Sequence, residues 1–399
     1  MRLRTLESYW LLKNGLLYSY PSAQSNIKTE IVVIGGGITG ALVSHGLMNA
    51  GFEVVMLDKR DIGQGSTSAT TSMLQYETDV SMVKLSESVG ANAAASIYKA
   101  GIAAIESLEV LIRDLDIDCG FELKRSLQLC HDPGLTNNLK DEFRLRNTYG
   151  INVKWGTRDQ ILEEFGLRGY GGIVSSSGGS LDAYELAHEL IYLNHKRGMK
   201  VFDQTTISEI KTSDNDHIII TDQGARITCK TIVYCNGFEA TEMLKEKIAS
   251  LYYTYASISE RDISIPEELF NTVVWDTNDP YFYMRTTEDC RLLIGGEDVD
   301  ASLPLQEKIR EEKAKRLIDT ATKMIPDLSY IEDFNWGGIF GATKDGLPYI
   351  GRSPEFPNSI FVLGYGGNGI IFSAQAMEMV PALLKGDTHP LMYYYRFGR

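Results

Sequence analysis

Three glycines and one aspartate near the N-terminus have the residue types and the spacing of a dinucleotide site. Gly35, Gly37 and Gly40 fit the pattern G-x-G-x-x-G directly after an apolar run, so backbone N–H groups can approach a pyrophosphate without side chains in the way. Asp58 lies 18 residues after the last of these glycines, where a carboxylate can accept hydrogen bonds from both hydroxyls of a ribose. The pattern predicts a site for NAD or FAD; the alternative is a chance glycine-rich turn.

Residues 63–73 follow this pattern and are almost all small. Their backbone donors and hydroxyls could run beside an isoalloxazine ring, which favours FAD over NAD. The alternative is a surface linker rich in Ser and Thr, but such linkers usually carry more charge or proline. The candidate contacts are Gly65, Ser66, Thr67, Thr70, Thr71 and Met73.

A second glycine-rich segment, residues 364–369, precedes an apolar helix that is expected to begin at Ile370. The positive end of that helix would stabilise the negative charge of a reduced flavin. An ordinary turn before a core helix is the competing interpretation. The candidate contacts here are Gly366, Gly367, Asn368, Gly369 and Ile370.

A strand, a helix and a second strand are needed to hold the first site. Residues 30–34 are a continuous β-branched run, typical of a strand buried on both faces, and residues 38–50 have a helical pattern. Residues 53–57 are a second apolar strand that ends at Asp58. Together these segments predict a βαβ unit.

Later segments of the chain are expected to add a strand to this sheet and to form a second sheet. Residues 231–235 resemble another buried strand, which ends in Asn236 and Gly237. Between residues 251 and 299, aromatic residues alternate along short strands, a pattern typical of an antiparallel sheet with one exposed face. The sequence therefore predicts a second domain. Helices are expected at residues 86–115, 181–197 and 305–324.

Composition and charge exclude several classes of protein. The 399 residues are 43% hydrophobic and 23% charged, which matches a globular protein rather than a disordered or low-complexity chain. A net charge of −14 disfavours nucleic acid as a partner. The cysteines form no C-x-x-C pair and the histidines lack metal-ligand spacing, so we expect a reducing compartment and no metal.

The N-terminal region does not have the pattern of a signal peptide. Its apolar run at residues 9–20 is broken by Lys13, Asn14 and Gly15. Other apolar runs fall far short of the ~20 residues that a membrane-spanning helix needs. We expect a cytoplasmic protein without a membrane span, and its oligomeric state is left open.

Four motifs occur in the order seen in the D-amino-acid-oxidase-like flavoproteins, which include glycine oxidase, sarcosine oxidase and γ-glutamylputrescine oxidoreductase. The motifs are GGGITG with LDKR, GSTSATTSML, TIVYCNG, and WGGIFGATKDGLPYIG leading to GYGGNGI. The resemblance covers residues 30–379. It implies an α/β fold in which a Rossmann-type FAD-binding domain is interleaved with an antiparallel-sheet substrate domain. We expect the first domain at residues 1–85, 172–247 and 335–399, and the second at residues 86–171 and 248–334.

The same resemblance implies cofactor, reaction and partners. The remaining expected FAD contacts are Ile38, Thr39, Lys59, Ile207, Asn236 and Gly237. The implied reaction oxidises the C–N bond of an amine or amino acid by hydride transfer to flavin, giving an imine, with oxygen or another acceptor taking the electrons. Two alternatives stay open: oxidation of a hydroxy acid or polyol phosphate, and a non-catalytic nucleotide-binding protein.

The chain departs from the family pattern where substrate recognition is concerned. Phe340 stands where glycine oxidase-like members carry an Arg that grips the substrate carboxylate, and Leu293 stands where sarcosine oxidase-like members carry a Lys. The turn around Phe340 also lacks the Cys used for covalent attachment, so we expect non-covalent FAD.

Another cation could replace the missing Arg. Strand alternation places Tyr281, Tyr283 and Arg285 on one face, which makes Arg285 the predicted substrate anchor. Tyr253 and Tyr283 are the further candidates for the active site. The alternative is that Arg285 is a solvated edge residue and that the tyrosines only pack across strands.

Overall fold

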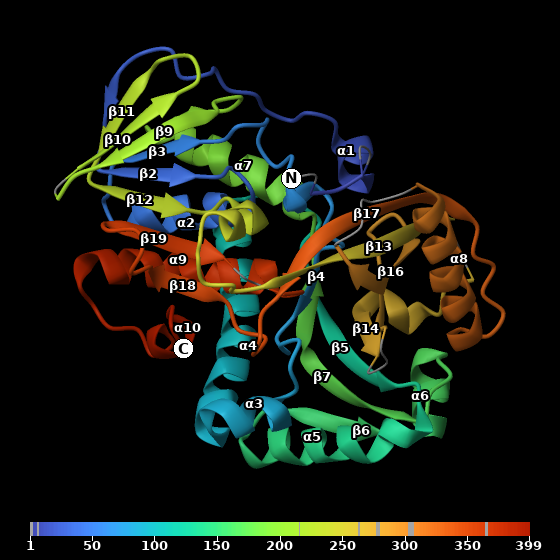
Figure 1. Ribbon diagram of the computed structural model, residues 1–399. Coiled ribbons are helices and arrows are strands. Elements are labelled where there is room, and N and C mark those ends of the chain that lie inside the picture. The colour runs from blue at the N-terminus through green and yellow to red at the C-terminus, as the bar shows by residue number, and fades with distance from the viewer. Residues whose placement is uncertain are drawn as a thin grey trace.

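The computed structural model describes residues 3–5, 8–214, 216–261, 264–276, 280–301, 307–363 and 366–399. In these ranges the strands form three sheets, and Figure 1 shows two of them stacked on one side of the molecule and the largest on the other. We call them the central, small and large sheets.

The central sheet contains the predicted βαβ unit. Its order is β18 (Tyr349–Arg352), β19 (Ser359–Leu363), β12 (Thr231–Tyr234), β2 (Ile31–Ile34), β3 (Val54–Leu57) and β8 (Lys200–Phe202). Neighbouring strands are parallel except β18, which runs antiparallel to β19. Helix α2 (Ile38–Asn49) connects β2 to β3, so the prediction for this region is confirmed.

Both faces of the central sheet are buried, which explains its continuous apolar strands. On one face, Val32 and Val55 pack with Ile219 and Ile227 of the small sheet. That sheet has the order β1 (Ile27–Lys28), β11 (Arg226–Cys229), β10 (His217–Thr221) and β9 (Ile207–Thr212). On the other face, Val33 belongs to the core that contains α2, α7 (Ala183–Lys196) and α9 (Gly369–Lys385).

The large sheet corresponds to the predicted aromatic strands but is mixed rather than purely antiparallel. Its order is β17 (Glu332–Ala342), β13 (Ser250–Arg261), β16 (Arg291–Asp300), β15 (Phe282–Thr286), β14 (Thr272–Asp276), β5 (Glu122–Cys130), β7 (Gly171–Ser180) and β4 (Met73–Gln75), and β6 (Val153–Gly156) pairs with β7. The pair β14 and β5 is parallel. The two strands lie more than a hundred residues apart in the chain, so local patterns could not reveal their direction.

The sheets cut across the domain boundaries expected from the sequence. Strands β4, β7 and β17 pair within the large sheet, although most of their residues fall in segments expected to belong to the FAD-binding domain. Strand patterns report burial and not which sheet a strand joins, so these crossings could not be located from the sequence. The division into two domains stays a prediction.

Helices pack on the central and large sheets. Helix α8 (Glu307–Met324) packs on the large sheet, where Leu317 and Met324 meet Phe282 and Met284 (Figure 1). The single helix expected at residues 86–115 is two helices, α3 (Met82–Val89) and α4 (Ala91–Asp114), because Gly90 lies between them at φ +86°. The remaining helices are α1 (Tyr9–Asn14), α5 (Thr136–Thr148), α6 (Arg158–Phe165) and α10 (Met392–Tyr395). Within the described ranges, no helix is long and apolar enough to cross a membrane.

Candidate active site

A cavity of about 1250 Å³ lies between the central and large sheets. This exceeds the roughly 300–1,000 Å³ of a pocket for one drug-sized ligand, so it can hold a cofactor and a substrate together. Its walls come from the ends of β2, β3 and β12, from residues 65–81, from the start of α9, and from six further strands of the large sheet. We call the part beside the central sheet the cofactor half and the part beside the large sheet the substrate half.

The glycines at the start of α2 leave no room for side chains. Gly35 adopts φ +110°, and a Cβ there would overlap the backbone of Cys235. A Cβ at Gly37 would lie 2.8 Å from Oγ1 of Thr67, the same atom that accepts the N–H of Ile38 at 3.0 Å. A Cβ at Gly40 would overlap the carbonyl oxygen of Gly35. The loop therefore exposes backbone instead of side chains to a ligand.

Asp58 holds its carboxylate at the end of β3, next to this loop. One oxygen accepts the N–H of Gly36 at 2.7 Å and the other accepts the N–H of Arg60 at 2.8 Å. Burial raises the pKa of Asp58, while these two backbone hydrogen bonds and the charge of Arg60 lower it. Each oxygen keeps a lone pair for a ribose hydroxyl.

Three side chains hold the loop at residues 69–71 by donating hydrogen bonds to its backbone carbonyl groups. Trp336 Nε1 donates to the carbonyl of Ala69 at 2.8 Å, Trp10 Nε1 to that of Thr70 at 2.6 Å, and Arg285 Nε to that of Thr71 at 2.7 Å. We call these three side chains the loop clamp. Three successive carbonyls thus accept from the clamp. The N–H groups of Ala69 and Thr70 both donate to the carbonyl of Ser66, so the loop can offer the hydroxyls of Thr70 and Thr71 to the cavity.

The start of α9 also reaches the cavity, and a carboxylate lies beside it. Asp79 accepts the N–H of Gly367 at 3.0 Å and Nδ2 of Asn368 at 3.3 Å. Asp79 is exposed to the cavity that it lines, and the reduced solvation there raises its pKa to about 6, with the Gly367 hydrogen bond opposing that rise. Residues 364 and 365 of the predicted glycine-rich segment lie outside the described residues. No motif in the sequence indicates this acid at the helix N-terminus.

The structure brings nearly all predicted cofactor residues to the cavity. Gly40 does not line it and acts through the close packing of α2 on Gly35. The others do line it: Gly35, Gly37, Ile38, Thr39, Asp58, Lys59, Gly65, Ser66, Thr67, Thr70, Thr71, Met73, Ile207, Asn236, Gly237, Gly366, Gly367, Asn368, Gly369 and Ile370.

Of the three predicted active-site side chains, only Tyr283 lines this cavity. Burial raises its pKa to about 12, and hydrogen bonds with Thr71 and Thr254 oppose that rise. Tyr253 instead belongs to the core under α8 and lines a separate cavity of about 420 Å³. The alternation along β13 explains this, because Tyr252 and Thr254 are the residues that face the large cavity.

Arg285 is 4% exposed and does not line the cavity. Besides Thr71, its guanidinium donates to the carbonyls of Thr286 and Leu181, and it lies 5.5 Å from the ring of Trp10. Side chains alternate between the two faces of β15 as predicted. The guanidinium of Arg285, however, is held by the carbonyl of Thr71 and the ring of Trp10. We therefore assign Arg285 to the loop clamp and not to a substrate contact.

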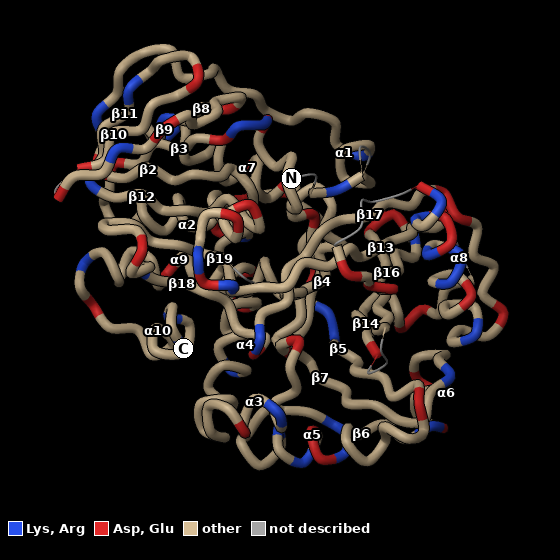
Figure 2. The backbone as a smooth tube through the Cα atoms, in the orientation of Figure 1, with Lys and Arg blue, Asp and Glu red and all other residues tan. Residues whose placement is uncertain are grey.

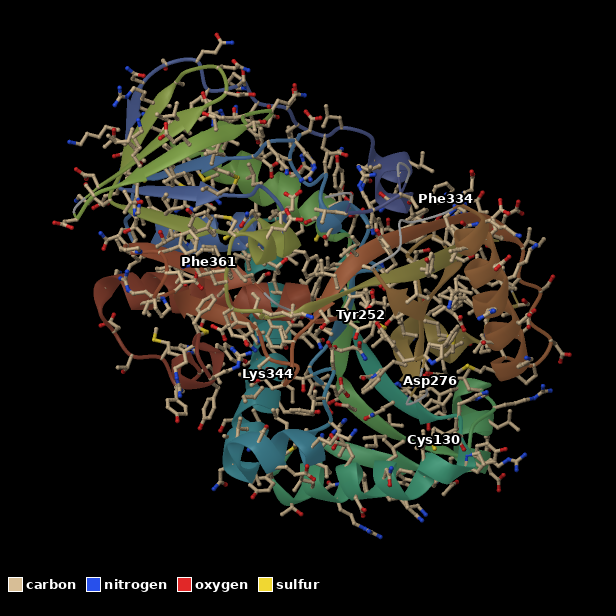
Figure 3. All side chains as sticks on the ribbon, in the orientation of Figure 1. Cys130, Tyr252, Asp276, Phe334, Lys344 and Phe361 are labelled. Carbon is tan, nitrogen blue, oxygen red and sulfur yellow. The ribbon has the colours of Figure 1, made fainter. Side chains whose placement is uncertain are left out.

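The two positions at which this chain departs from the family pattern lie in different surroundings. Phe340 lines the cavity and stacks on Tyr252 at 5.6 Å, whereas Leu293 is fully buried beside Trp10 and Tyr184. Figure 3 labels Tyr252, and also Asp276 at the end of β14, both on the large sheet.

Cys235 lines the cofactor half, and burial raises the pKa of its thiol, so little thiolate is present for covalent attachment.

Several cavity residues were missed by the sequence analysis. Leu3 reaches the cavity because Arg4 forms a β-bridge with Gly338. Glu77, Asp79 and Asp276 come from loops and strand ends without a recognisable motif. Among the described residues, no group of three or more His, Cys, Asp or Glu side chains could hold a metal ion.

The residues of the cofactor half fit FAD. The bare glycine loop and the start of α2 suit a pyrophosphate, and Asp58 suits a ribose. The clamped loop and the start of α9 line the same cavity and are the segments that could flank a flavin ring. Bound FAD would supply a hydride acceptor at this point of the cavity.

Comparisons with known proteins agree with this fit. The family described as FAD dependent oxidoreductase matches residues 30–380. The chain is 24% identical over 365 residues to glycine oxidase of Geobacillus kaustophilus, covering 89% of this chain and 93% of that protein. It is also 24% identical over 398 residues to gamma-glutamylputrescine oxidoreductase of Escherichia coli, covering 95% and 89%.

Solved structures show the same fold. The structure of glycine oxidase from Geobacillus kaustophilus superposes with a TM-score of 0.80 at 21% identity, covering 94% of this chain and all of that one. That of L-proline dehydrogenase from P. horikoshii gives 0.78 at 22% identity, covering 93% and 97%. Because the family match spans most of the chain, the protein belongs to the family of FAD-dependent oxidoreductases.

Proposed function

We propose that the protein oxidises the C–N bond of an amine or amino acid with non-covalently bound FAD. The observation that carries this proposal is one continuous cavity, in which the glycine loop and Asp58 of the cofactor half are joined to the aromatic side chains of the substrate half. A cofactor and a substrate can therefore meet inside it, at the clamped loop and the start of α9.

The chain's own residues would orient the substrate and keep water out. Tyr281 and Tyr283 stack with ring centroids 5.6 Å apart, and Phe340 and Tyr252 form a second stacked pair. These rings shield the reacting carbon from water, and the reacting amine must be neutral when it is oxidised, because its lone pair forms the new bond. The substrate C–H bond breaks with its electron pair, and the hydride passes to the bound flavin. The nitrogen lone pair forms the C=N bond of an iminium ion, which loses a proton to water. The resulting imine is hydrolysed by water.

The alternative of a polyol phosphate substrate has little support in the described residues. A phosphate needs clustered cations or backbone donors. In the substrate half, Lys84 is the one cation among the described lining residues, and it lies exposed on α3.

The test is anaerobic bleaching of the protein's flavin by a panel of amines, N-methyl amines and amino acids. We expect at least one of them to reduce the flavin. If none does, while dithionite reduces it fully, amine oxidation is the wrong reaction. Acid precipitation should release the flavin into the supernatant, and flavin retained in the pellet would contradict non-covalent binding.

A further inference from the structure

The substrate half of the cavity is lined by an excess of carboxylates. Lys84 is the cation that accompanies them among the described residues. Figure 2 shows red acidic segments along β16 and the neighbouring chain in this part of the molecule. The carboxylates are Glu77, Asp79, Asp276, Asp298 and Asp300.

Aromatic rings line the same space. Tyr281 and Tyr283 stack, and Tyr252 stacks on Phe340. The faces of such rings attract cations, with most effect where water is excluded. Trp275 also lines this half and adds the ring type that attracts cations best.

The carboxylates and the rings act on one another. Burial raises the pKa of Tyr281 well above its usual value, and the charges of Asp298 and Asp79 raise it further. Asp298 has the same effect on Tyr283. Both carboxylates are therefore close enough to act on the tyrosine pair.

A buried ion cluster behind the cavity includes one of the lining carboxylates, Glu77, whose pKa is raised by burial while the charge of Arg146 opposes that rise. Arg146 is fully buried and pairs with both Glu77 and Glu142, so two carboxylates face one guanidinium. Glu77 is 3% exposed and lines the cavity. Its Oε1 accepts from Arg146 and Ser126, but its Oε2 has no hydrogen-bond partner among the described residues. A buried carboxylate oxygen in this state indicates an unfilled place for a donor.

We propose that the substrate is a diamine-type cation, which reacts at one amine, carries a second positive charge at its far end and has no carboxylate beside the reacting carbon. This inference rests on the proposed function and specifies its substrate class. A zwitterionic amino acid would need a cation for its carboxylate, and the structure places Phe340 and not an arginine in the cavity wall. Like charges in a poorly solvated space repel strongly, so an anionic group would be disfavoured there.

The first test uses the FAD-loaded protein and three probes that differ only at the far end. Butane-1,4-diamine ends in an ammonium, butylamine in a methyl group and 4-aminobutanoate in a carboxylate. We measure the dissociation constant of each by anaerobic calorimetry and the rate of flavin reduction by stopped flow. The diamine should bind roughly tenfold or more tightly than butylamine, and 4-aminobutanoate most weakly. Added salt should reduce the difference between the dissociation constants of the diamine and butylamine.

The second test removes one charge from the cavity. Asp298→Asn should weaken diamine binding by roughly tenfold and leave butylamine nearly unchanged. The matched control is Asp319→Asn, which removes the same charge from the exposed surface of α8 and should leave the ratio between the probes unchanged. The comparison of the three probes uses the unsubstituted protein, so it still decides the question if Asp298→Asn does not fold.

The outcomes separate this inference from the proposed function. Tighter binding or faster flavin reduction with glycine, proline or 4-aminobutanoate than with the diamine would overturn the inference and leave amine oxidation standing. Equal binding of the diamine and butylamine would also overturn it. Failure of every amine and amino acid to reduce the flavin would instead refute the proposed function.

Discussion

The two halves of the cavity contact their ligands in different ways. In the cofactor half, the protein presents mostly backbone, with glycines packed so closely that a Cβ at Gly40 would overlap Gly35. In the substrate half, it presents side chains from six strands of the large sheet, β5 and β13 to β17. The first half recognises a fixed cofactor shape, while the second distinguishes ligands by charge and aromatic contact.

This difference determines how each half should respond to substitution. A backbone surface depends on close packing, so a single methyl group can destroy it. A side-chain surface can lose one group and keep its shape, so a substitution there should change preference more than folding. Asp58 differs from the glycines of the cofactor half, because it acts through a charged side chain that two backbone donors hold in place.

The largest effect is expected from Gly40→Ala. The added methyl group must displace the carbonyl of Gly35, and overpacking of this kind costs about 1–3 kcal/mol or more. We expect the variant to purify without FAD and to unfold at a lower temperature, as measured by the flavin-to-protein ratio and Tm. The control is Gly134→Ala at an exposed position, which should keep its flavin. Full flavin content in Gly40→Ala would show that α2 is not packed on the loop in this way.

Asp58→Ala should have the next largest effect. It removes two hydrogen bonds to ribose, each worth about 1.5–3 kcal/mol when one partner is charged. The dissociation constant of FAD should rise at least roughly a hundredfold, as measured by titration of FAD-free protein. Asp61→Ala, which removes a nearby carboxylate that does not line the cavity, should leave FAD affinity unchanged. Unchanged affinity in Asp58→Ala would place the ribose elsewhere.

The cofactor half could be predicted from the sequence because its information is local. Gly35 to Asp58 form one βαβ unit, so spacing alone orders the loop, the helix and the acid. The substrate half depends on strand pairing. Tyr253 was chosen although its neighbour Tyr252 faces the cavity, and a shift of one residue in a strand reverses the face.

Arg285 shows a second limit of the sequence. Its face of β15 follows from alternation, but the carbonyls of the 69–71 loop and the ring of Trp10 come from segments more than two hundred residues away. No local pattern indicates that they take up its guanidinium. The same holds for Glu77 and Asp79, whose neighbours are supplied by distant segments.

Arg285→Met tests whether the loop clamp belongs to the cofactor half. It removes the donor to the Thr71 carbonyl, so FAD affinity should fall by roughly tenfold, the loss of one hydrogen bond to a charged group. Amines with and without a carboxylate should be affected equally. Arg285→Lys keeps the charge and should recover part of the affinity. A loss confined to carboxylate-bearing substrates, with FAD binding intact, would restore Arg285 as a substrate anchor.

The smallest effect is expected at Asp79, where the two halves meet. Reduced solvation in the cavity raises its pKa to about 6, so the carboxyl is mostly protonated below that pH and charged above it. The charged form lies against the N–H of Gly367, just before α9, where it opposes negative charge on a reduced flavin. The reduction potential of the flavin should therefore fall more steeply as the pH rises through about 6 than it does in Asp79→Asn, which keeps the shape and cannot ionise. The measurement is the flavin potential of both proteins at several pH values on either side of 6. Parallel curves would show that Asp79 does not change its charge beside the ring, and the boundary between the two halves would then lie on the substrate side of this residue.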